Sequence, residues 1–119
     1  MEHTNPFANP VFDLAPDEVH RRLSTGSATL IDVREHYERD ISHIPGSRHL
    51  EIDRVAWNAH TIDWSVPVIF HCRLGWRAAM VTQAFRAIGR EAFNLDGGMV
   101  AWAELELPIT PPGSTVSPH

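Results

Sequence analysis

An uninterrupted apolar run at residues 66–70 constrains the fold of this chain more than any other feature. A short run that is apolar at every position is typical of a strand with both faces buried, as in a parallel sheet. Pro67 then lies near the start of the strand, where a missing N–H is tolerated. Beyond a short loop, apolar residues recur at helical spacing from Ala78 to Ile88, and Gly89 follows as a C-terminal cap. The segment therefore predicts a strand, a loop and a helix in succession.

The rest of the chain repeats this alternation. Residues 28–34 and 92–95 are short apolar runs of strand type, whereas residues 16–26, 35–40 and 99–105 have helical features. Strands that alternate with helices predict an α/β layer fold with a parallel sheet. A length of 119 residues allows one domain. We expect a flexible N-terminal arm at residues 1–10, the domain at 11–107 and a flexible C-terminal tail at 108–119.

Composition excludes several classes of protein. The formal net charge is −5, which argues against a general nucleic-acid binder. All ten basic residues are arginine, and the missing lysine excludes Schiff-base chemistry and a P-loop. The single cysteine, Cys72, excludes an internal disulfide, a C-x-x-C pair and a multi-cysteine zinc site. No secretory signal or membrane span is visible, so we expect a cytoplasmic protein in which a lone thiol stays reduced.

Cys72 lies where the buried strand ends and the helix begins. The first N–H groups of a helix have no partner within the helix, and they favour an anion such as the nucleophilic thiolate. The segment from Cys72 to Arg90 contains four arginines and no acid. Arg73 and Arg77 bracket the loop and would attract an anionic substrate. Gly75 allows the loop amides to turn inward. The competing interpretation is a small buried cysteine with no chemistry, which is the usual role of a free cysteine.

Other polar residues favour structural roles. Neighbouring residues of a strand point to opposite faces, so His71 diverges from Cys72 and is expected to be structural. Asp32 and Arg34 end a strand near the site and are expected to form a buried ion pair or to pin a loop. Glu35 and Glu38 are expected to lie on a solvated helix face. Neither a metal nor a cofactor is predicted, because four histidines lack the spacing of a metal motif: His36, His43, His49 and His60.

Three segments, taken in order, carry a resemblance to a known family. Cys72-Arg73-Leu74-Gly75-Trp76-Arg77 resembles the C-x-x-G-x-R active-site loop of rhodanese-like sulfurtransferases. Residues 30–35, with the turn at 43–47, are similar to the upstream L-I-D-V-R-E and G-H-I-P-G-A signature of that family. Residues 94–102 are similar to its closing L-x-G-G-x-x-A-W segment. Ser42 stands where the family usually has glycine, and Ala78 stands where serine often follows the loop arginine.

The resemblance implies a three-layer fold, with a mostly parallel central sheet and helices on both faces. It implies a thiosulfate sulfurtransferase in which Cys72 takes a sulfur from thiosulfate or another sulfane donor and passes it to cyanide or a thiol. The loop residues Arg73, Leu74, Gly75, Trp76 and Arg77 would bind the substrate, with Trp76 as a wall of the pocket. Arg77 would also orient the loop. No nucleic acid, membrane or cofactor is implied.

Two other functions stay open. One is a module that carries persulfide or docks a partner without turnover. The other is a phosphatase or arsenate reductase on the same fold. Those enzymes use a C-x5-R loop, and the position where that arginine would fall is Ala78. The shorter loop therefore favours sulfur chemistry over phosphorus chemistry.

Overall fold

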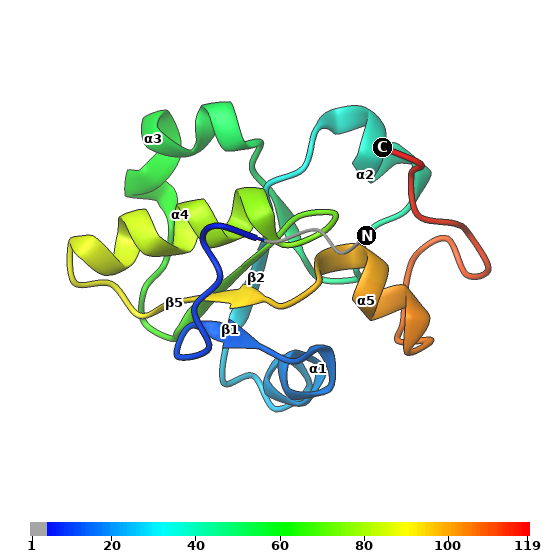
Figure 1. Cartoon of the computed structure of the whole chain (residues 1–119), viewed down its shortest axis with the longest axis horizontal. Helices are drawn as coiled ribbons and strands as arrows, with labels where there is room; N and C mark the ends of the chain where they lie inside the picture. Colours follow the sequence, from blue (N-terminus) through cyan, green and yellow to red (C-terminus); the bar gives the residue numbers. More distant parts are fainter. Residues whose placement is uncertain (1–4) are drawn as a thin grey trace.

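The structure is a computed structural model that describes residues 5–119, so the first four residues of the expected arm lie outside it. A parallel sheet forms its centre (Figure 1). The strands are β1 (Asp13–Leu14), β2 (Thr29–Asp32), β3 (Arg48–His49), β4 (Val68–His71) and β5 (Ala92–Leu95). The α-helices are α1 (Pro16–Ser24), α2 (His36–Ile41), α3 (Val55–Asn58), α4 (Trp76–Ala87) and α5 (Gly98–Glu104), and the 3-10 turns are η1 (Ile52–Arg54) and η2 (Ala59–Thr61).

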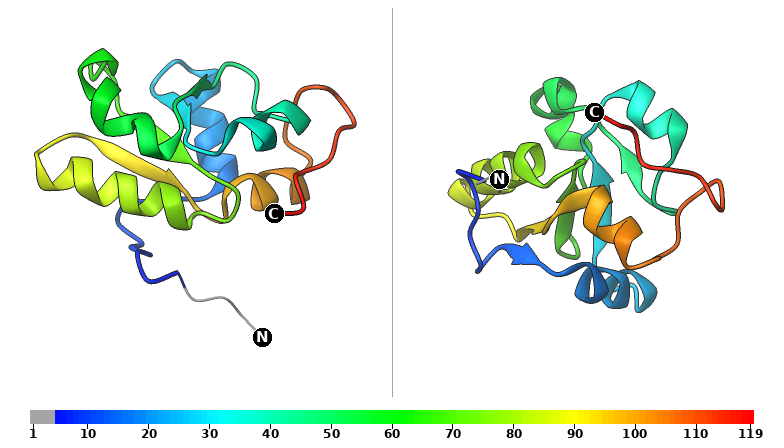
Figure 2. Two further views of the ribbon diagram at one scale, coloured as in Figure 1. Left: turned by 90° about the horizontal axis from the view of Figure 1, so that it is seen from above. Right: turned by 45° about the vertical axis from the view of Figure 1, so that its right-hand side comes forward.

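The sheet has the strand order β1-β5-β4-β2-β3, and every neighbouring pair is parallel. Helices α3 and α4 cover one face, while α1 and α5 cover the other (Figure 2). The expected three-layer α/β fold is therefore confirmed. None of the helices in the described part of the chain has the length and apolarity needed to span a bilayer.

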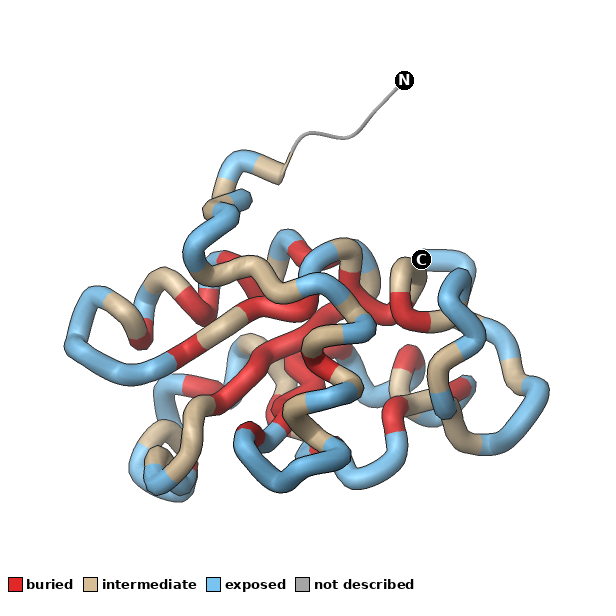
Figure 3. The backbone as a smooth tube through the Cα atoms, turned by 90° about the horizontal axis from the view of Figure 1, so that it is seen from below, coloured by how far each residue is buried: buried red, intermediate tan, exposed pale blue. Residues whose placement is uncertain are grey.

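The buried strand residues divide between two cores because successive side chains of a strand point to opposite faces. In β4, Val68 and Phe70 pack on the α3 and α4 side, whereas Ile69 packs on the α1 and α5 side. In β2, Ile31 and Leu30 divide in the same way. Figure 3 shows this buried band running through the centre of the molecule. The apolar run at 66–70 is therefore a central strand, as its composition predicts.

The carboxyl ends of β2, β3 and β4 meet at one edge of the sheet. Asp32 is in register with His49 of β3 and with His71 of β4. Cys72 follows His71 directly. In open parallel sheets this edge is where ligands bind, so the topology places Cys72 where a site is expected.

The last residues of the chain lie against this edge. The composition of residues 108–119 predicts a flexible tail, but the structure shows specific contacts there, and Ser117 is fully buried. Three side chains of the domain donate hydrogen bonds to backbone carbonyls of the tail: Ser42 Oγ to Thr115 (2.7 Å), Arg73 Nε to Ser117 (2.7 Å) and Tyr37 Oη to His119 (2.9 Å).

Candidate active site around Cys72

The loop after β4 wraps its backbone around the sulfur of Cys72. Gly75 N–H and Ala78 N–H donate to Cys72 Sγ, at 3.1 and 3.4 Å. Gly75 adopts φ of 103°, a conformation that side chains disfavour, and α4 begins at the next residue. The sulfur therefore receives one donor from the loop and one from the first turn of the helix, where N–H groups have no partner within the helix.

Cys72 is almost fully buried, yet it lines an open hollow of about 320 Å³. A small reactant can therefore reach a sulfur that bulk water contacts little. Four of the five expected loop residues line this hollow, all except Gly75: Arg73, Leu74, Trp76 and Arg77. His119 of the tail also lines it, and the sequence analysis did not predict this residue.

Helix α5 supports the loop from behind. Met99 N–H donates to Cys72 O at 2.8 Å, and Val100 N–H donates to Arg73 O at 3.1 Å. Gly98 allows this approach, because a Cβ atom at this position would lie 2.5 Å from Cys72 O. The sequence shows Gly97-Gly98 only as the end of a strand. The feature that could have indicated its role is glycine itself, because only a residue without Cβ fits at this point of contact.

Arg77 forms an ion pair with Glu38. Its Nη1 and Nη2 atoms donate to the two carboxylate oxygens of Glu38, at 2.7 and 3.0 Å. Glu38 is buried, so the expectation that it lies on a solvated helix face is wrong. Burial would raise the pKa of Glu38, but the hydrogen bonds from Arg77 and from Glu35 N–H outweigh this effect and hold the pKa below its usual range. The pair ties α4 to α2 beside the site.

Arg73 keeps its charge available to a ligand. Its Nε atom binds Ser117 O, and within residues 5–119 no carboxylate forms an ion pair with it. Arg77 also lines the hollow, but Glu38 compensates its charge. Among the two loop arginines, Arg73 therefore supplies the uncompensated positive charge at the mouth of the hollow.

Asp32 and Arg34 form a fully buried ion pair, as expected from the sequence. Arg34 Nε and Nη2 donate to the two oxygens of Asp32, both at 2.9 Å, and Arg39 Nη1 adds a third contact at 3.2 Å. Burial would raise the pKa of Asp32, but the contacts with Arg34, together with the positive charge that His71 gains in acid, outweigh this and hold the pKa below its usual range. Arg34 also donates to Ser42 O, so the pair fixes the end of α2.

His71 lies beside Asp32 and is not part of the lining of the hollow at Cys72. Its side chain is fully buried, and Nε2 is 3.8 Å from Asp32 Oδ1. Burial lowers the pKa of His71 from 6.5 to about 4, although Asp32 attracts the charged form. The imidazole is therefore neutral in the folded protein at neutral pH.

This shift predicts a loss of stability in mild acid. The unfolded chain binds a proton at His71 near pH 6.5, whereas the folded protein does so only near pH 4. The contribution of neutral His71 to the free energy of unfolding is therefore complete above pH 6.5. As the pH falls toward 4, this contribution is lost, and the free energy of unfolding decreases by on the order of 3 kcal/mol. Urea unfolding between pH 4 and 8 measures this loss. His71→Leu should flatten the dependence over that range, and an unchanged slope would show that another group is responsible.

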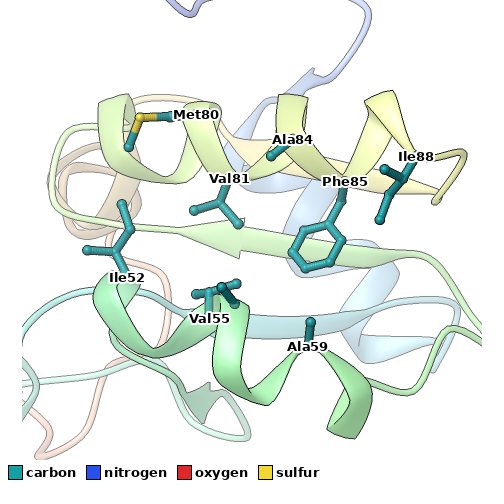
Figure 4. A pocket seen from close by; sticks show the side chains of 9 residues that line it. Ile52, Val55, Ala59, Met80, Val81, Ala84, Phe85 and Ile88 are labelled. Carbon is teal, nitrogen blue, oxygen red and sulfur yellow. The ribbon is translucent and has the colours of Figure 1, made fainter.

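A second hollow, of about 350 Å³, lies between α3 and α4 (Figure 4). Its lining is apolar, with Val55 on one side and Met80, Phe85 and Ile88 on the other. No nucleophile or charged side chain lines it. Of these two hollows, only the one at Cys72 has a nucleophile and charged side chains in its lining.

The fold and this loop define a class of protein: an α/β domain in which two backbone N–H groups bind the sulfur of one cysteine at the carboxyl ends of the strands. The sequence comparison places the chain in that class, because the Rhodanese-like domain family matches residues 15–105. The chain belongs to the rhodanese-like family.

Curated relatives and solved structures agree with this assignment. An HTH-type transcriptional regulator of Mycobacterium tuberculosis is 35% identical over 95 residues, which are 77% of this chain and 42% of the regulator. The chain thus matches less than half of that relative. Thiosulfate sulfurtransferase GlpE of Pseudomonas aeruginosa is 30% identical over 90 residues, 75% of this chain and 81% of the relative.

Among solved structures, a rhodanese-related protein from Thermoplasma volcanium matches with a TM-score of 0.78 and 19% identity, over 83% of this chain and 97% of the other. A rhodanese-like domain protein from Staphylococcus aureus matches with a TM-score of 0.72 and 24% identity, over 89% and 98% of the two chains. At these identities, the likeness establishes the fold.

Proposed function

We propose that this protein is a thiosulfate sulfurtransferase with Cys72 as nucleophile and sulfur carrier. The observation that carries the proposal is the pair of backbone N–H groups, from Gly75 and Ala78, directed at Cys72 Sγ. Such donors favour both the thiolate and a persulfide anion that replaces it. Further support comes from the relative named as a thiosulfate sulfurtransferase.

Two half-reactions follow from this arrangement. The Cys72 thiolate attacks the outer sulfur of thiosulfate, so that a new S–S bond forms and the old one breaks. Sulfite leaves with the electron pair of the broken bond. Cyanide or an acceptor thiolate then attacks the outer sulfur of the Cys72 persulfide, takes that sulfur and regenerates the thiolate. No external oxidant or reductant is needed, and a reducing compartment such as the cytoplasm suits the free thiolate.

The tightness of the loop favours sulfur over a phosphoryl or arsenyl group. Both Gly75 N–H and Ala78 N–H already bind the sulfur itself, so the donors are arranged around one atom at Cys72. A tetrahedral oxyanion bound above the sulfur needs additional donors directed at its oxygens. Arg77, which closes the loop, has two of its nitrogens bound to Glu38 instead.

Mass spectrometry of the intact protein tests the proposal. Incubation with thiosulfate should add one sulfur atom to the protein, and cyanide should remove it and yield thiocyanate. Turnover with cyanide or a thiol separates an enzyme from a persulfide carrier, because a carrier forms the adduct without repeated release. Phosphatase turnover without a sulfur adduct would contradict the proposal.

The two loop arginines are predicted to affect different kinetic constants. Arg73→Ala should raise KM for thiosulfate roughly tenfold, because a hydrogen bond to a charged group contributes about 1.5 kcal/mol. Arg77→Ala should mainly lower kcat, because α4 and the loop lose the tie to buried Glu38. Steady-state kinetics over a range of thiosulfate concentrations separates the two effects.

The control is Arg54→Ala, which removes the same charge from an exposed position away from the hollow. It should leave both constants unchanged. An equal rise in KM for Arg54→Ala and Arg73→Ala would mean that net charge, rather than a contact at the site, attracts the donor.

A further inference from the structure

Two histidines and a glutamate gather at the same edge of the sheet, outside the hollow at Cys72. His36 begins α2, His49 ends β3, and Glu51 follows two residues later. One side-chain donor atom of each lies within 4.8 Å of the others, and the two imidazole rings are 6.2 Å apart. The three residues do not follow the i, i+4 spacing within one helix that common metal motifs have, so their spacing in the sequence does not indicate a metal site.

The Nε2 atom of His49 has the kind of hydrogen-bond partner that the non-ligating nitrogen has in most metal-binding histidines. His49 Nε2 is 2.8 Å from Arg34 O, and a carbonyl oxygen can only accept, so Nε2 is the protonated nitrogen. The lone pair of the neutral ring is therefore on Nδ1. A ligating histidine usually donates its other N–H to a carbonyl or carboxylate, which fixes the ring and its tautomer.

His36 has the same kind of partner. Its Nε2 is 3.3 Å from Asp40 Oδ2, and a carboxylate favours a protonated nitrogen there. His36 is exposed, so its ring can rotate toward the other two side chains. Ligands of a tetrahedral zinc ion lie roughly 3.3 Å from one another, given metal–ligand bonds of about 2.0 Å. Closing the cluster from 4.8 Å to that spacing requires side-chain movement, which the exposed His36 can supply.

We propose that His36, His49 and Glu51 form a binding site for a divalent transition-metal ion of the zinc type, with water completing its coordination. Imidazole and carboxylate together suit Zn²⁺. His49 lies two strands from the position that precedes Cys72, or roughly 10 Å across the sheet. The ion would therefore tie α2 to the end of β3 rather than bind the sulfur. This inference does not depend on the sulfurtransferase activity.

Zinc binding to the untagged chain of 119 residues tests the site. The Cys72→Ser background removes the thiol as a competing ligand. Titration against a chromophoric zinc chelator should show one ion per chain, and zinc should raise Tm. His36→Ala and Glu51→Gln should each abolish the rise in Tm, because both change partly exposed side chains and leave the fold intact. Asp40→Ala, which removes only the partner of His36, should weaken binding about 10- to 100-fold.

The matched control is His60→Ala, which removes an exposed histidine outside the cluster and should bind zinc as the parent does. Absence of zinc binding to the parent would overturn the proposal. Equal binding by the parent, His36→Ala and Glu51→Gln would also overturn it, because the ion would then bind elsewhere on the chain.

Discussion

Cys72→Ser is expected to abolish sulfur transfer, with a fall in turnover of roughly a thousand-fold or more. Serine keeps an atom that can accept hydrogen bonds from Gly75 and Ala78, so the loop should keep its shape. The hydroxyl, however, is a weak nucleophile without a base and cannot carry sulfane sulfur in place of a thiolate. Turnover with thiosulfate and cyanide, and the intact mass after thiosulfate alone, measure the two losses.

Thermal unfolding provides the control for this variant, because Cys72→Ser should keep a Tm close to that of the parent. Cys72→Ala, which also removes the hydrogen-bond acceptor, should be equally inactive. Retention of a cyanide-labile sulfur in either variant would place the carrier elsewhere and contradict the proposed chemistry.

Asp32→Asn is expected to have the largest effect on stability. The carboxylate is fully buried and accepts hydrogen bonds from Arg34 and Arg39. Asparagine keeps the shape but leaves the buried guanidinium of Arg34 without a counter-charge and turns a donor toward it. Removal of one partner from a buried pair costs about 3–5 kcal/mol. That is a large share of the total stability of a domain, so Tm should fall by roughly 10–20 °C.

The control is Asp53→Asn, which removes an exposed carboxylate and should change stability by less than about 0.5 kcal/mol. Urea unfolding at pH 7.5 compares the two variants. An equal and small effect for both would mean that the buried pair contributes little beyond its packing, and that an apolar pair could replace it.

The main elements of the fold could be predicted from local patterns. The apolar run at 66–70, the helical spacing after Ala78 and the glycine between them carry the strand, loop and helix that hold Cys72. Local patterns do not indicate the strand β1, which has two residues, or the short helical elements η1, α3 and η2 at 52–61, which lack periodicity. These elements are held by the packing of the whole domain rather than by their own propensity.

Pairings between distant residues could not be predicted in the same way. Glu38 and Arg77 are 39 residues apart, and a charged helix normally indicates a solvated face. Only the folded sheet brings α2 beside α4, and the buried carboxylate then needs a partner. The same holds for the tail, because its proline, glycine and serine content indicates a loose segment, whereas its carbonyl oxygens meet donors from Ser42 and Arg73.

The position of this tail has a practical consequence for the experiments above. Because His119 lines the hollow at Cys72, an affinity tag joined after it would emerge at the entrance used by the reactants. Such a fusion could obstruct large acceptors while admitting cyanide, and so imitate a preference for small ones. Acceptor panels are therefore best compared between protein free of any appended residues and protein that carries them.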